Sequence, residues 1–129
     1  MTKKDIFDRI IDVVCECSCV DRARLISGDK ERDVVDARVL AVQYLWRAGF
    51  SYDEIAVFVE DERHPEIKHI SADESVKKRA KNFDKIRRAY NDRCYQSISF
   101  CIISKHVSES LRREYDSFSN YEFVPMKHI

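Results

Sequence analysis

The sequence contains very few of the residues that interrupt secondary structure. Only two glycines and two prolines occur among its 129 residues, so few tight turns are expected. Hydrophobic residues make up 44% of the chain and charged residues 36%, which is typical of a globular protein rather than a disordered one. This composition favours an all-α fold with short connections.

Long apolar runs are also missing. The first ten residues, MTKKDIFDRI, place charges among the apolar positions, and a signal peptide or a membrane-spanning helix requires a continuous apolar segment. We therefore expect a cytoplasmic protein with no membrane partner. An odd number of cysteines without a secretory signal predicts free thiols and no disulfide framework. They are Cys15, Cys17, Cys19, Cys94 and Cys101.

Recognisable catalytic and metal-binding patterns are absent from the sequence. It has no glycine-rich phosphate loop and no nucleophile elbow, and its carboxylates alternate with basic residues. The Cys15, Cys17 and Cys19 thiols would scatter around a helix, so we interpret them as small buried hydrophobes. His64 and His69 are five residues apart and share no helical face. The prediction is a protein that is not an enzyme and has no metal or cofactor.

Helical periodicity covers the first half of the chain. Thr2 and Asp5 form a variant of the capping box that opens a helix ending near Cys19. A short turn over residues 21–25 and a loop at residues 27–29 precede a helix over residues 31–48. Ser51 and Glu54 form a second capping box, which opens a short helix with its apolar residues at positions 55–59.

The second half is predicted to contain three more helices. Pro65 suits the first position of a short helix that runs to about Ile70. Ser71 and Glu74 form a capping box for a long helix, whose expected buried stripe is Val76, Ala80, Phe83, Ile86 and Tyr90. After a break at residues 91–92, the last helix is expected over residues 95–118. Its main apolar stripe is Ile98, Cys101, Ile102, Leu111, Tyr115 and Phe118, and the apolar residues off this stripe are Tyr95, Phe100, Ile103 and Val107.

Charge is balanced over the chain but unevenly distributed along it. Residues 1–62 carry 9 basic and 14 acidic side chains, whereas residues 63–93 carry 10 basic and 5 acidic ones. An acidic body with one basic segment can present a face to a polyanion, or the segment can dock against the body through opposite charge. Composition alone leaves both interpretations open.

Residues 10–59 resemble the C-terminal DNA-binding domain of the bacterial replication initiator DnaA. The matching segments are Val34-Val35-Asp36-Ala37-Arg38, then Tyr44-Leu45, and then the turn and Glu-Ile at residues 51–55. The resemblance implies a Trp-repressor-like helix-turn-helix bundle over residues 10–70. We therefore predict a DnaA-C-like domain at residues 1–70, followed by a two-helix extension at residues 71–129 that packs on this domain or on a partner chain.

The resemblance also implies which residues would contact DNA. In the family, an Arg-Asp-His-Thr-Thr-Val signature begins the recognition helix. Aligned without gaps it falls on residues 62–67, and with a gap it falls on residues 73–76. Together with the family's basic loop, the two alignments predict DNA contacts from Lys30, Arg32, Arg63, His64, Lys68, His69, Lys77, Lys78 and Lys81.

Two hypotheses of function follow from the sequence. The first is a helix-turn-helix protein that binds DNA weakly or without sequence specificity, in replication or in a mobile element. The alternative is a DnaA-like fold that has lost DNA readout and serves as a protein-interaction or oligomerisation module. In that case the last helix would supply an apolar face to a partner protein or to a second copy of the chain.

Overall fold

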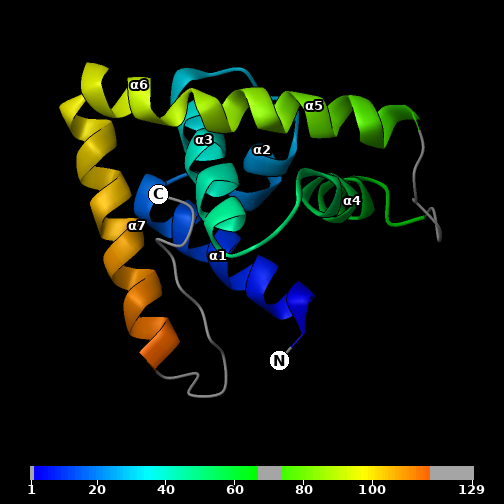
Figure 1. Ribbon diagram of the computed structural model, residues 1–129, viewed down its shortest axis with the longest axis horizontal. Coiled ribbons are helices and arrows are strands. Elements are labelled where there is room, and N and C mark those ends of the chain that lie inside the picture. Colours follow the sequence, from blue (N-terminus) through cyan, green and yellow to red (C-terminus); the bar gives the residue numbers. More distant parts are fainter. Residues whose placement is uncertain (1, 67–73, 117–129) are drawn as a thin grey trace.

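The computed structural model describes residues 2–66 and 74–116, and this part of the chain contains helices joined by short connections and no strand (Figure 1). The all-α prediction is therefore confirmed for the described residues. The helices are α1 (Lys3–Ser18), α2 (Arg22–Ile26), α3 (Arg32–Arg47), α4 (Tyr52–Arg63), α5 (Glu74–Arg88), α6 (Tyr90–Gln96) and α7 (Ile98–Asp116).

Both predicted capping boxes in the first half of the chain are confirmed. The Thr2 hydroxyl accepts a hydrogen bond from the Asp5 backbone N–H at 3.2 Å, and the Asp5 carboxylate accepts one from Thr2. Ser51 and Glu54 make the same reciprocal pair at the start of α4. Gly49 ends the preceding helix with a φ of 97°, a conformation that disfavours any residue with a side chain.

Helix α3 lies at the centre of the fold, with buried residues on several of its sides. Helices α1 and α5 pack against it, α4 packs under α5, and α7 packs against α1 (Figure 1). Helices from both halves of the sequence contribute to one hydrophobic core. Its largest fully buried side chains are Tyr44, Phe7, Phe100, Ile10, Ile11, Leu40, Leu45, Ile55 and Leu111.

The predicted core positions of the first half are mostly confirmed. Ala41, Leu45 and Ile55 are buried in this cluster, whereas Val35 and Phe58 are only half-buried. The Phe58 ring still contributes, because its centroid lies 5.0 Å from that of Phe7 at the edge of the core. The stripe predicted for α5 also faces inward, although Ile86 is half-buried.

The breaks between the last helices differ from the prediction. We expected an interruption at residues 91–92, but Asn91 and Asp92 lie in the first turn of α6, and the helices separate at Ala89 and at Ser97. Ser97 has an extended backbone, with φ −140° and ψ 113°, and its hydroxyl accepts a hydrogen bond from the Phe100 N–H. Ser97 thus acts as a cap, and the last helix begins at Ile98 rather than at Tyr95.

The buried face of α7 is also different from the predicted one. Leu111 is buried as predicted, but Phe100 and Val107 from outside the predicted stripe are buried too, whereas Ile98 and Ile102 are exposed. The difference follows from tertiary packing, because Tyr44 and Tyr90 contact the Phe100 side of α7. Ser104 on the same face is buried as well, and its hydroxyl lies 2.9 Å from the Tyr44 hydroxyl and 2.5 Å from that of Tyr90.

The short helix predicted to begin at Pro65 is wrong at its start. Helix α4 continues to Arg63, well beyond the expected apolar stretch at residues 55–59, and His64 caps its end. Pro65 and Glu66 lie in a turn, and the rest of the predicted helix lies outside the described residues.

The N-terminal cysteines follow the prediction only in part. Cys15 and Cys17 are half-buried beside the core, but Cys19 is exposed, because it ends α1 in a left-handed conformation with φ 55°. Burial raises the pKa of the Cys15 thiol to about 11. At neutral pH this thiol stays protonated and is therefore a poor nucleophile.

Replacing Leu45 by Ala should lower the free energy of unfolding by about 2–5 kcal/mol, because Leu45 is fully buried in α3. Urea denaturation followed by circular dichroism measures this change. Ile98→Ala is the matched control, since Ile98 is 80% exposed and should change stability by less than about 0.5 kcal/mol. Equal effects of the two substitutions would contradict this description of the core.

Candidate nucleic-acid interface

Helix α5 carries a row of exposed lysines. Lys77, Lys78, Lys81 and Lys85 are all exposed, and their spacing places them within an arc of about 100° on one side of the helix. Within the part of the chain that the structure describes, none of these four lysines has an acidic partner. We call these four residues the lysine stripe.

Two arginines of α5, in contrast, have partners within the protein. Arg87 donates a hydrogen bond to the Tyr52 hydroxyl at 2.5 Å and lies 4.0 Å from the centre of the Trp46 ring. Arg88 pairs with Asp84, one turn earlier, at 3.0 Å. The Arg87 contacts hold α5 to α4 and α3, whereas Arg88 is exposed and its pair lies within α5 itself.

A buried carboxylate on α4 gathers several of the remaining basic groups. Glu60 is 5% exposed and forms an ion pair with Arg79 of α5. Neither the Arg79 Nε nor the Glu60 Oε1 has a well-directed hydrogen bond, so the attraction between them is mainly ionic. Arg63 lies 3.9 Å from the same carboxylate, and His64 Nε2 lies 3.7 Å from its second oxygen.

This cluster places Arg63 and His64 differently from the family alignment without gaps. That alignment puts them at the start of a recognition helix, but they lie in the last turn and at the C-terminal cap of α4. Their side chains face Glu60, and His64 also lies 3.5 Å from Glu66. The alternative alignment, at residues 73–76, coincides with the start of α5 at Glu74.

The basic loop implied by the resemblance precedes α3. Lys30 in this loop and Arg32 at the first position of α3 are both exposed, and acidic residues flank them on both sides. Arg38 shapes this loop by donating hydrogen bonds to the carbonyl oxygens of Leu25, Ser27 and Asp29. Burial lowers the pKa of Arg38, and the charges of Arg79 and Arg63 lower it further.

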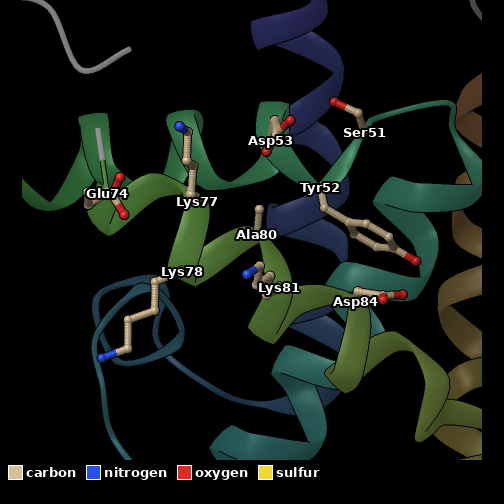
Figure 2. Close-up of a pocket in the computed structure, with 9 residues that line it drawn as sticks. All are labelled: Ser51, Tyr52, Asp53, Glu74, Lys77, Lys78, Ala80, Lys81 and Asp84. Carbon is tan, nitrogen blue, oxygen red and sulfur yellow. The ribbon is translucent and has the colours of Figure 1, made fainter. Parts of the chain in front are cut away.

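A groove of about 810 Å³ lies along the line where the start of α4 meets α5 (Figure 2). Ala80 lies between the two helices, with Asp53 and Lys77 on one side of it and Tyr52 and Asp84 on another. Three lysines and three carboxylates line the groove together. The lining residues are Ser51, Tyr52, Asp53, Glu74, Lys77, Lys78, Ala80, Lys81 and Asp84.

The predicted site residues thus fall into three groups. Lys77, Lys78 and Lys81 come together on α5, and Arg63 and His64 lie at Glu60. Lys30 lies in the loop before α3, and Arg32 is the first residue of that helix. Lys68 and His69 lie outside the described residues. Lys85 was not among the predicted residues, although its spacing of four from Lys81 indicates the same helical side. Tyr52 was not predicted either, because its position in the groove depends on tertiary packing.

No group of three or more His, Cys, Asp or Glu side chains within residues 2–66 and 74–116 is arranged to hold a metal ion. No helix in these ranges is both long and apolar enough to cross a membrane.

Comparisons of the chain with protein-family models, with curated proteins and with solved structures gave no match.

Replacing Arg79 by Leu should destabilise the protein by about 2–3 kcal/mol, less than the 3–5 kcal/mol expected for a fully buried pair, because Arg63 still faces the carboxylate. Replacing Glu60 by Leu as well should restore part of this loss, since no buried charge is then left unpaired. Thermal and urea denaturation of both variants measure the difference. A single variant as stable as the parent would show that the pair does not hold α5 on α4.

Proposed function

We propose that this protein binds duplex DNA through phosphate contacts from the lysine stripe, without reading base sequence. One observation carries the proposal: four lysines lie on one exposed side of α5 with no acidic partner among the described residues. A flexible lysine that is not paired inside the protein keeps its full charge for an external anion.

The dimensions of the stripe suit a duplex. From Lys77 to Lys85 it extends about 12 Å along the helix. Duplex DNA carries one negative charge per about 1.7 Å of its axis, so each lysine has phosphates within reach. The resemblance to the DnaA C-terminal domain supports the same function, since that domain is a DNA-binding one.

Sequence-specific readout has less support. Arg63 and His64, the predicted base-contacting residues, lie beside the buried Glu60 carboxylate at the end of α4 rather than at the start of a helix, although the His64 side chain is 45% exposed. Asp53 and Glu74 beside the stripe repel phosphates and oppose deep entry into a DNA groove. We therefore infer weak binding that depends on charge and is similar for different duplex sequences.

Neutralising Lys77, Lys78 and Lys81 together, each to Gln, should flatten the slope of log affinity against log salt concentration by about 2.7, because each phosphate contact contributes about 0.9. Fluorescence anisotropy with a labelled random duplex at several salt concentrations measures the slope. The effect should be the same for duplexes of different sequence.

The matched control neutralises three exposed basic residues of α7, Lys105, Arg112 and Arg113, and changes the net charge by the same amount. It should alter the slope much less than the stripe variant does. If the two triple variants bind alike, net charge alone explains the binding. If the parent protein does not retain DNA even at low salt, the proposal is rejected.

A second candidate function, self-association, has an observation of its own. Three large hydrophobic residues of the described part of the chain are exposed, namely Tyr95 at 93%, Ile98 at 80% and Ile102 at 49%. All three lie where α6 ends and α7 begins. We call them the corner patch. Stable interfaces usually involve about 20–30 residues a side, so this smaller patch favours a weak, concentration-dependent association of two copies.

Replacing Ile98 and Ile102 by Ser should return the mass in solution to the 15.3 kDa of one chain at concentrations where the parent is heavier. Light scattering over a concentration series measures this. Lys105→Ser with His106→Ser is the control on the exposed side of the same helix. A parent that stays at one chain throughout the series would contradict self-association. Deleting residues 95–129 is a poorer test, because it also removes Phe100 and Leu111 from the core.

A further inference from the structure

We propose that the groove between α4 and α5 binds one unpaired nucleotide of single-stranded DNA. The inference rests on the proposed function, because the lysines that line the groove belong to the lysine stripe. It goes further by naming a substrate that duplex binding does not require.

The size of the groove is appropriate for this ligand. Its volume of about 810 Å³ lies within the range of about 300–1,000 Å³ that is usual for small-molecule pockets. It is open along one side, where Lys77 and Lys81 extend from α5 (Figure 2). A nucleotide can therefore enter while the phosphates on either side of it remain at the lysines.

Tyr52 supplies the aromatic ring of the groove, on the side of Ala80 where Asp84 lies. Its hydroxyl accepts the hydrogen bond from Arg87, and the Arg87 guanidinium lies over Trp46. The ring is therefore held in one orientation before any ligand arrives, which reduces the entropy lost on binding. Aromatic side chains beside a basic groove are the usual stacking platforms for bases of single strands. A paired base keeps both faces stacked inside the duplex and cannot use this ring.

The carboxylates of the groove, which oppose phosphate binding, suit a base. Asp84 already pairs with Arg88, but Asp53 is exposed at the rim. A carboxylate accepts a hydrogen bond from the exocyclic amino group of cytosine, whereas thymine has no such group. The groove should therefore prefer oligo-dC to oligo-dT, although the two strands carry the same charge.

The test uses fluorescence anisotropy of the full chain with labelled oligo-dC, oligo-dT and a blunt duplex of equal length. Oligo-dC should bind about fivefold or more tightly than the duplex, and dCMP should displace it better than dTMP does. This comparison requires no mutation, so it does not depend on the folding of a variant. Equal binding of oligo-dC and the duplex, with no displacement by dCMP, would overturn the inference.

Substitutions at Tyr52 separate the ring from its hydroxyl. Tyr52→Leu should weaken oligo-dC binding about fivefold or more and leave duplex binding unchanged, whereas Tyr52→Phe should keep most of the single-strand affinity. Tyr95→Leu, at the exposed corner of α6, is the matched control. If Tyr52→Leu has no effect on oligo-dC while the stripe variant still weakens duplex binding, the nucleotide site is rejected and the proposed function stands. If neither DNA form binds, both are rejected.

Discussion

The pairing of Glu60 with Arg79 is the contact on which the arrangement of this protein's outer surface depends. A carboxylate that is 5% exposed requires a compensating charge, and Arg79 supplies it from the second turn of α5. The requirement fixes the rotation of α5 on α4 near its start, while Arg87 fixes it near its end through Tyr52 and Trp46. Because Arg79 and Arg87 fix the rotation of α5 at two positions, the side of α5 that carries the lysine stripe faces solvent. The groove lies between the first half of α5 and the start of α4.

Arginine and lysine have separate roles on this helix because their side chains differ. The planar guanidinium is weakly hydrated and stacks on aromatic rings, so it tolerates partial burial, as Arg87 does over Trp46 and Arg79 does beside Glu60. The ammonium of lysine is strongly hydrated and loses more by burial, so Lys77, Lys81 and Lys85 remain in water. A basic segment with both residue types can therefore dock against the acidic body through its arginines and present its lysines to a polyanion. The two interpretations of the charge distribution are thus compatible.

The sequence predicted local features well and failed where distant contacts decide. Capping boxes at Thr2 and Ser51 depend on residues three apart, and both are present in the structure. The break at Ser97 and the burial of Phe100 could not be read locally, because Ile98 and Phe100 are equally suitable for a buried helical face. What selects Phe100 is the position of the Tyr44 and Tyr90 hydroxyls, which hold the same side of α7 through Ser104.

The candidate site was predictable to the same extent. The lysine stripe follows from spacing along one helix. Arg63 and His64 were predicted from the family alignment, and their position beside Glu60 at the end of α4 could not be read from that alignment. The stripe and the corner patch lie toward opposite ends of the nearly straight path of α5 and α6, with α7 turning away at the corner (Figure 1). Because the two surfaces are separate, DNA binding and self-association do not exclude each other. Two copies joined at the corner patch would present two stripes, and a second DNA contact within one assembly is favoured by effective concentration without any new interaction.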